Sequence, residues 1–151
     1  MAAKQLIDVR ARSAAPPDAV WALLTDTPSW PRWSPVEQAE RTRDGEGDPE
    51  GVGSQRVFRT GRVRNEEEIV HFEPGRALSY RVIGGNLPLR DYRADVTLTP
   101  SGDGTDIVWR SVFRSKYPGL GGFVRRRLRG FIQETADGLA RAAEGAPPQS
   151  A

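Results

Sequence analysis

The sequence predicts an α+β fold, in which a curved antiparallel sheet of about six to seven strands wraps around a long C-terminal helix. Three observations predict it. The chain from Val36 to Ser115 reads as strands punctuated by turn residues. The connections are short, so consecutive strands should pair antiparallel. The segment from Gly121 to Glu144 carries one apolar stripe at helical spacing, which must be buried against the apolar face of the sheet.

Length and composition indicate one domain. The chain has 151 residues, which is the usual size of a single domain. It shows no internal repeat, no linker and no second zone of composition. We expect the domain to span residues 5–144. Residues 145–151 are expected to form a disordered tail, because that end is short and rich in proline and small residues.

Composition also excludes several classes of function. With no cysteine and a single histidine, His71, the chain is not expected to hold a disulfide, a metal ion or a redox cofactor. The 22 basic and 20 acidic residues give a net charge of +2, which does not favour nucleic acid as a partner. No long apolar run or signal-like N-terminus is present, so we expect a cytoplasmic protein. The preference for arginine over lysine indicates a bacterial source, and both a monomer and a homodimer stay open.

The first elements are predicted from alternation and from helix-start signals. Ile7, Val9 and Ala11 alternate with polar residues and share one face of a strand. The run Pro16-Pro17-Asp18 begins a helix, because proline fits the first turn and an early aspartate suits the positive end of the helix dipole. A short helical turn from Trp30 to Trp33 completes a helix pair after the first strand.

Five further strands follow an acidic, glycine-rich loop over residues 44–53. Turn residues set their boundaries. In the second of these strands, Ile69 and His71 fall on one parity while Val70 and Phe72 fall on the other, which indicates a β-bulge. The predicted strands are Ser54 to Thr60, Arg62 to Phe72, Ala77 to Ile83, Tyr92 to Thr99 and Thr105 to Ser115.

The C-terminal segment is the longest predicted helix. It ends before Gly145 and two prolines, a common stop signal. Arg127 lies roughly 70° from the centre of its apolar stripe, so its side chain is placed to reach a cavity beside the helix. The stripe consists of Leu120, Val124, Leu128, Phe131, Thr135, Leu139 and Ala142.

The order of elements and three motifs resemble the SRPBCC superfamily, which contains START lipid-transfer domains, Bet v 1-like proteins and polyketide cyclases. The motifs are the segment from Ala14 to Asp26, the run from Trp30 to Pro35 and the turn from Phe72 to Val82. The resemblance covers residues 5–144 and implies the helix-grip fold, with an apolar cavity between sheet and helix. It is specific for the fold and not for one activity, because one fold carries many functions.

The residues expected to line this cavity are mostly large and apolar. Trp33 and Trp109 are the strongest candidates for ligand contact, because an indole offers a wide contact area and an N–H that needs a partner. Ordinary core packing is an equal alternative for each apolar residue. The candidates are Trp30, Trp33, Tyr80, Leu87, Tyr92, Trp109, Phe113, Val124, Arg127, Leu128 and Phe131.

Few residues indicate catalysis, and the sequence assigns no catalytic residue. His71 is the side chain expected to titrate near neutral pH, but no nucleophile motif accompanies it and a surface or half-buried strand position is favoured. Along Glu66, Glu67 and Glu68, alternation sends the middle carboxylate to one face and its neighbours to the other. The sequence does not decide which face is turned toward the cavity, and solvated strand charges are the favoured interpretation.

Two loops and an arginine cluster are candidate features of the surface. The glycine-rich loop lacks the lysine of a phosphate-binding loop and is acidic, which favours a mobile entrance loop. The segment from Gly84 to Leu89 is a second candidate rim, and a plain hairpin turn with two core leucines is an equal alternative. Arg125, Arg126 and Arg129 are interpreted first as a solvated helix face, second as a contact for an anionic membrane and third as a nucleic-acid contact.

We therefore expect a carrier or sensor that binds a hydrophobic or amphipathic small molecule, such as a lipid or polyketide. Arg127 or Tyr92 would orient a polar head group. One alternative is a polyketide cyclase or dehydratase that uses His71, Glu67, Tyr80 or Arg127 as acid–base groups. A structure in which such groups converge on one point of the cavity would favour this enzyme. The other alternative is a protein-interaction module of toxin–antitoxin type, whose sign would be an exposed apolar patch and no open cavity.

Overall fold

A computed structural model describes residues 3–145 and confirms the predicted α+β arrangement. One antiparallel sheet contains seven strands in the order β1-β7-β6-β5-β4-β3-β2. The strands are β1 (Lys4–Ser13), β2 (Gln38–Arg43), β3 (Gln55–Thr60), β4 (Val63–Glu73), β5 (Ala77–Gly85), β6 (Leu89–Ser101) and β7 (Gly104–Ser115). The helices are α1 (Pro17–Leu24), the 3-10 turn η1 (Thr27–Ser29), α2 (Trp30–Trp33) and α3 (Gly121–Gly145).

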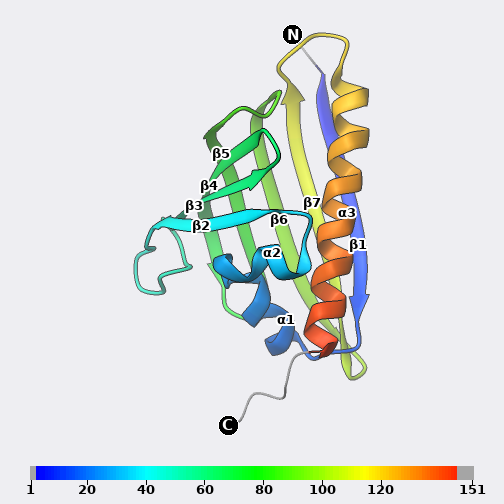
Figure 1. Cartoon of the computed structure of the whole chain (residues 1–151). Helices are drawn as coiled ribbons and strands as arrows, with labels where there is room; N and C mark the ends of the chain where they lie inside the picture. The colour runs from blue at the N-terminus through cyan, green and yellow to red at the C-terminus, as the bar shows by residue number, and fades with distance from the viewer. Residues whose placement is uncertain (1–2, 146–151) are drawn as a thin grey trace.

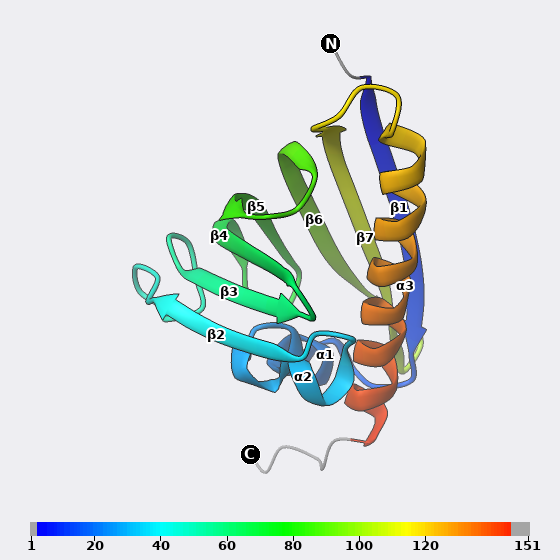
Figure 2. The same ribbon diagram turned by 45° about the horizontal axis from the view of Figure 1, so that its top comes forward.

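The sheet curves around α3. This helix runs alongside β1 and β7, while α1 and α2 lie across the opposite end of the strands from the N-terminus (Figure 1). In the turned view, β2 and β3 run in a different direction from β1 and β7, which shows the curvature of the sheet (Figure 2). Of the predicted tail, only Gly145 is described, where it ends α3; residues 146–151 lie outside the described residues.

The elements at the N-terminus form as predicted. Ile7 and Val9 of β1 are 3% and 0% exposed and Ala11 is half-buried, so all three face the core. Pro17 occupies the first turn of α1, and α2 is the single helical turn expected over the two tryptophans. Ser13 Oγ donates to the Ala140 carbonyl at 2.8 Å, which joins the end of β1 to α3.

Strand β2 is absent from the predicted strands. Its sequence, QAERTR, contains one apolar residue, Ala39, and therefore lacks the hydrophobic alternation that marks a strand. The structure places it at the edge of the sheet, where it pairs with β3 alone. Because most of this strand is exposed, its stability comes from main-chain pairing and not from a buried face.

The β-bulge predicted in β4 is confirmed. The register between β4 and β5 shifts between Ile69 and His71. Ile69 is 2% exposed and faces the core, whereas His71 lies on the outer surface and Phe72 turns inward against the core. The bulge therefore explains why the two parities conflict along this strand.

The apolar stripe of α3 is correct in its middle and incomplete elsewhere. Val124, Thr135 and Leu139 are buried. Leu120 is wrong as a stripe residue, since it precedes the helix and is 47% exposed. Toward its C-terminus the helix packs on two sides, against β1 and against α1 and α2, which buries more of its surface. The further buried residues there are Ile132, Ala136, Gly138, Ala140 and Ala143.

The described helices contain no segment long and apolar enough to span a bilayer.

Candidate functional site

A cavity of about 450 Å³ lies between the concave face of the sheet and α3. Its size is that of pockets that bind small organic molecules. Side chains from β3 to β7 form one wall and side chains from α2 and α3 form the other. Of the sequence-predicted candidates, those that line it are Trp30, Tyr80, Leu87, Tyr92, Trp109, Val124, Arg127, Leu128 and Phe131.

Trp33 and Phe113 do not line the cavity. Trp33 is 9% exposed and lies against Trp30, with ring centroids 4.8 Å apart, while its indole N–H donates to Ser29 Oγ at 3.0 Å. Phe113 is 1% exposed and packs beside Tyr92. Both are core residues, and neither is among the side chains that line the cavity.

Trp109 lines the cavity, but its N–H is not free. The indole N–H donates to the Tyr80 hydroxyl at 3.1 Å. Protein oxygens therefore satisfy the indole N–H groups of both Trp33 and Trp109, so neither N–H is left for a ligand. Trp109 contributes its apolar surface to the cavity.

Glu67 is the carboxylate that faces the cavity. It is 5% exposed and lines the wall together with Asn65, which lies two residues earlier on the same face of β4. Its neighbours point outward, where Glu66 pairs with Arg64 and Glu68 pairs with Arg81. The interpretation of these carboxylates as solvated charges is therefore wrong for Glu67, whose face is fixed by the pairing of β4 with β3 and β5.

Arg56 neutralises Glu67 from behind. It lies directly opposite Glu67 in the register of β3 and β4, is 2% exposed, and places Nη2 3.0 Å from Glu67 Oε1. The guanidinium carbon lies 5.0 Å from the ring centroids of Trp30, Phe58 and Tyr80. These cation–π contacts replace part of the hydration that the arginine loses.

The pKa of the Glu67 carboxyl group reflects two opposing effects. Burial raises this pKa because it disfavours the charged form, while the charge and hydrogen bond of Arg56 and the hydrogen bond from Asn65 lower it. Burial prevails, so the pKa lies above its ordinary value. A buried acid whose pKa is raised beside a cavity is the kind of group that serves binding or proton transfer.

Two tyrosines complete what we call the polar end of the cavity, formed by Asn65, Glu67, Tyr80 and Tyr92. The Tyr92 hydroxyl shares a hydrogen bond of 2.8 Å with Ser111 Oγ, and the rings of the two tyrosines lie 6.1 Å apart. Burial raises the pKa of both phenols well above the ordinary value. Both hydroxyls are therefore neutral near pH 7 and present O–H groups, not anions.

The mouth of the cavity is lined by exposed side chains: Val63, Phe123 and Arg127. Phe123 is 60% exposed, and the guanidinium carbon of Arg127 lies 5.8 Å from its ring centroid. Leu87 and Leu89, from the predicted rim segment, are half-buried and also line the cavity. Arg127 therefore lies where the cavity meets solvent and not deep within it.

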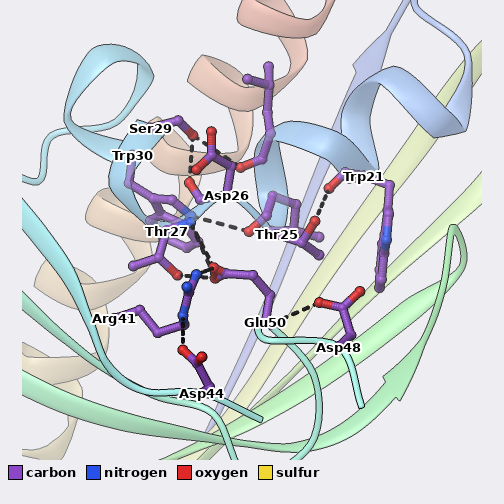
Figure 3. Close-up of polar contacts among 12 residues, drawn as sticks. Trp21, Thr25, Asp26, Thr27, Ser29, Trp30, Arg41, Asp44, Asp48 and Glu50 are labelled. Atoms are coloured by element: carbon purple, nitrogen blue, oxygen red, sulfur yellow. Dashed lines mark hydrogen bonds and ion pairs between the residues drawn. The ribbon is translucent and has the colours of Figure 1, made fainter. Parts of the chain in front are cut away.

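The glycine-rich loop is not an entrance loop. None of its residues lines the cavity, and Glu50 ties it to the helical end of the fold. Glu50 accepts a hydrogen bond of 2.5 Å from Thr27 Oγ1 and one of 2.8 Å from Arg41 Nη1, while Arg41 also pairs with Asp44 (Figure 3). The loop is thus anchored to η1 and β2.

His71 takes no part in the site. Its side chain is 48% exposed and lies 3.5 Å from Glu73 on the outer surface. The sequence did not single out Asn65, although its parity with Glu67 along β4 was a usable signal once the inward face was known. Across residues 3–145, no group of three or more acidic or histidine side chains is placed to hold a metal ion.

Comparisons with known proteins agree with this geometry. Residues 4–144 match the family model described as polyketide cyclase / dehydrase and lipid transport. The fold is similar to that of Ara h 8.0201, at 15% identity and a TM-score of 0.76, with 95% of this chain and 100% of that chain covered.

Two further structures show the same likeness of fold. Norcoclaurine synthase from Thalictrum flavum, solved with dopamine and hydroxybenzaldehyde, gives 18% identity and a TM-score of 0.74, covering 98% of this chain and 91% of that one. XoxI from Bacillus cereus gives 19% identity and a TM-score of 0.72, covering 93% and 94%. A search of curated protein sequences finds no match. The family match over nearly the whole chain, together with the shared fold, shows that the chain belongs to the polyketide cyclase / dehydrase and lipid transport family of the SRPBCC, or Bet v 1-like, superfamily.

Proposed function

We propose that the protein binds a hydrophobic or amphipathic small molecule in the cavity between the sheet and α3, as a carrier or sensor. The observation that carries the proposal is the cavity itself, about 450 Å³ in volume, with a mostly apolar wall and a few polar groups at one end. Burial of apolar ligand surface would supply most of the affinity. The cavity also disfavours the alternative of a protein-interaction module, because that alternative was expected to show no open cavity.

Native mass spectrometry of protein purified without detergent tests the proposal. We expect a discrete adduct that is released on denaturation and is identified as a lipid or an aromatic molecule. A bare mass that persists across a panel of fatty acids and polyketide mimics would contradict it.

Arg127 gives the proposal a test by charge. Its guanidinium at the mouth would attract an anionic head group while the apolar body enters the cavity. The Arg127→Ala variant should bind anionic ligands about tenfold more weakly and neutral ligands unchanged, as measured by calorimetry. Equal losses for both kinds of ligand would contradict an orienting role.

An enzyme is the second candidate, and the polar end of the cavity favours it. The pKa of Glu67 is raised, and Glu67 lines the same cavity as Tyr80 and Tyr92, so a carboxyl group and two phenols are gathered there. Such a group can move a proton at a carbonyl or hydroxyl of a bound polyketide. Cyclisation or dehydration of a polyketide mimic that is lost in Tyr80→Phe, with binding retained, would support catalysis; binding without turnover would leave the carrier.

Contact with an anionic membrane is proposed for the surface beside the mouth. Leu120 is 47% and Phe123 60% exposed there. Arg125, Arg126 and Arg129 are exposed and form no ion pair with another described residue. Salt-sensitive binding to phosphatidylglycerol vesicles, lost when these three arginines are changed to alanine, would support this contact. Absence of binding at low salt would refute it.

A further inference from the structure

We infer that the polar end of the cavity selects a neutral hydrogen-bond donor, the hydroxyl group of a phenol or alcohol, and rejects a carboxylate. This inference rests on the proposed binding function and narrows its ligand class. It comes from the charge balance and hydrogen-bond capacity of Arg56, Glu67 and Asn65.

The first argument is charge. Glu67 and Arg56 form a buried pair whose net charge is zero, with exposed fractions of 6% and 2% for their side chains. A charged ligand group of either sign at this end would be buried without a partner, which is strongly unfavourable. The other cation on the cavity wall, Arg127, lies at the mouth. An anionic group is therefore directed outward, and the inner position is left for a neutral group.

The second argument is hydrogen-bond capacity. Glu67 Oε1 accepts from Arg56, while Oε2 accepts from Asn65 Nδ2 at 2.6 Å and keeps a free lone pair. This contact fixes the Asn65 amide with its nitrogen toward the carboxylate. Asn65 Oδ1 is consequently buried without a hydrogen-bond partner among the described residues. Arg56 Nη2, a donor, also lacks a hydrogen bond among these residues, but Arg56 does not line the cavity, whereas Asn65 and Glu67 do. The groups turned toward a ligand are therefore unused acceptors, and a buried acceptor gains most from a donor.

The third argument is the surface around these acceptors. The cavity wall next to Glu67 includes Trp30, Phe58, Tyr80, Tyr92 and Trp109. Aromatic rings pack well against other aromatic rings in offset or edge-to-face geometry. A phenolic ring would therefore place its O–H toward Glu67 while its body lies against this wall.

Three naphthalene compounds of similar size test the inference: 2-naphthol, which donates a hydrogen bond, 2-methoxynaphthalene, which does not, and 2-naphthoate, which is anionic. Calorimetry at pH 7 should show that 2-naphthol binds with about tenfold higher affinity than 2-methoxynaphthalene, which is the effect of one hydrogen bond to a charged acceptor. In an Arg127→Ala background, which removes the cation at the mouth, 2-naphthoate should bind more weakly than both.

Variants test whether the polar end of the cavity causes the preference for 2-naphthol over 2-methoxynaphthalene. The double variant Arg56→Met/Glu67→Leu removes both charges together and should bind 2-methoxynaphthalene normally while losing the preference for 2-naphthol. The single variant Asn65→Leu keeps the ion pair and should reduce the preference at least threefold, which covers the case of a double variant that does not fold. Thr135→Val is the matched control: Thr135 also lines the cavity, but its hydroxyl already donates to the Phe131 carbonyl at 2.8 Å, so the preference should persist.

The outcomes separate the two proposals. Binding of 2-naphthol and 2-methoxynaphthalene with equal affinity, or tightest binding of 2-naphthoate in the Arg127→Ala background, overturns the inference and leaves the binding function intact. Failure of all three compounds to bind overturns the binding of aromatic ligands and the inference with it.

Discussion

Arg56 and Glu67 are the residues whose burial is most costly, since each carries a charge that is almost fully removed from water. Their mutual attraction, the cation–π contacts of Arg56 and the hydrogen bond from Asn65 offset this cost. A well-packed apolar pair is often at least as stable as a buried ion pair, so stability alone does not account for these residues. Glu67 is the member of the pair that lines the cavity. We therefore expect the protein to be stable when both charged residues are present or both are replaced, and to lose stability when only one of them is replaced.

A double-mutant cycle tests this dependence. Arg56→Met alone leaves a buried carboxylate unpaired and should lower the free energy of unfolding by about 3–5 kcal/mol at pH 7. Arg56→Met/Glu67→Leu leaves no charge behind and should lie within about 1 kcal/mol of the wild type. Urea denaturation measures both values. Additive losses in the double variant would show that the pair is not coupled.

The position of Arg56 was out of reach of sequence reasoning. In the run Arg56-Val57-Phe58, Arg56 and Phe58 share the inward parity, whereas arginine is normally exposed. Glu67 could be placed only as one of three adjacent glutamates. The partner that makes its burial possible lies across the sheet, and cross-strand register is not visible in local composition.

Among the elements, α3 depends on one close approach to α2. A Cβ atom added at Gly138 would lie 1.8 Å from the Trp33 carbonyl oxygen. Glycine thus allows the helix to pack directly on the backbone at the end of α2. At Gly130, in contrast, an added Cβ would meet nothing within 4 Å.

These two glycines give a matched pair of variants. Gly138→Ala should lower the free energy of unfolding by about 2–3 kcal/mol, because α3 must move away from Trp33. Gly130→Ala should raise it by about 0.5–1 kcal/mol, because alanine restricts the unfolded chain and favours the helix. Thermal and urea unfolding measure both changes. A similar effect of the two substitutions would contradict the close packing of α3 on α2.

Glu50 joins the loop over residues 44–53 to Thr27 and Arg41, and we expect these contacts to stabilise the loop. Glu50→Ala removes the contacts with Thr27 and Arg41 and should lower the free energy of unfolding by about 1–3 kcal/mol. Amide hydrogen exchange should become faster in the loop, while ligand affinity should stay unchanged, because the loop contributes nothing to the cavity wall. The exposed Glu46→Ala is the control. A change in ligand affinity on Glu50→Ala would restore the loop as part of the site.

The strands and helices differ in how far local sequence specifies them. The last two strands were predictable because each has a buried and a wet face, and the bulge in β4 was visible as a conflict of parity at Val70. Strand β2 escaped prediction because an exposed edge strand needs no apolar alternation. The Gly138 contact escaped because it depends on a helix distant in sequence.

At the scale of the whole molecule, the fold follows from pairing one apolar sheet face with one apolar helix stripe, which the sequence displays. The cavity does not follow in the same way. Its volume is the space that curvature leaves between the two layers after the side chains are placed, and Trp33 and Phe113 show that apolar type alone does not separate lining residues from core. The candidate site was therefore predicted in its general location and aromatic character. Of its polar end, Tyr80 and Tyr92 were predicted as lining residues and Glu67 only as a candidate acid–base group, whereas Asn65 was not predicted.

Filling the cavity tests its role for the molecule as a whole. Leu128 lines the cavity from α3 and is half-buried, so Leu128→Trp directs a larger side chain into a space of about 450 Å³. The protein should gain about 1 kcal/mol of unfolding free energy, because an open apolar cavity destabilises the fold. It should also lose at least tenfold in affinity for 2-naphthol, and the rise in melting temperature that this ligand causes should disappear. The control Leu6→Trp makes the same chemical change at a site 67% exposed on β1, where neither quantity should move. Undiminished binding to a stable Leu128→Trp protein would place the ligand elsewhere, because a tryptophan and a ligand cannot occupy the same space.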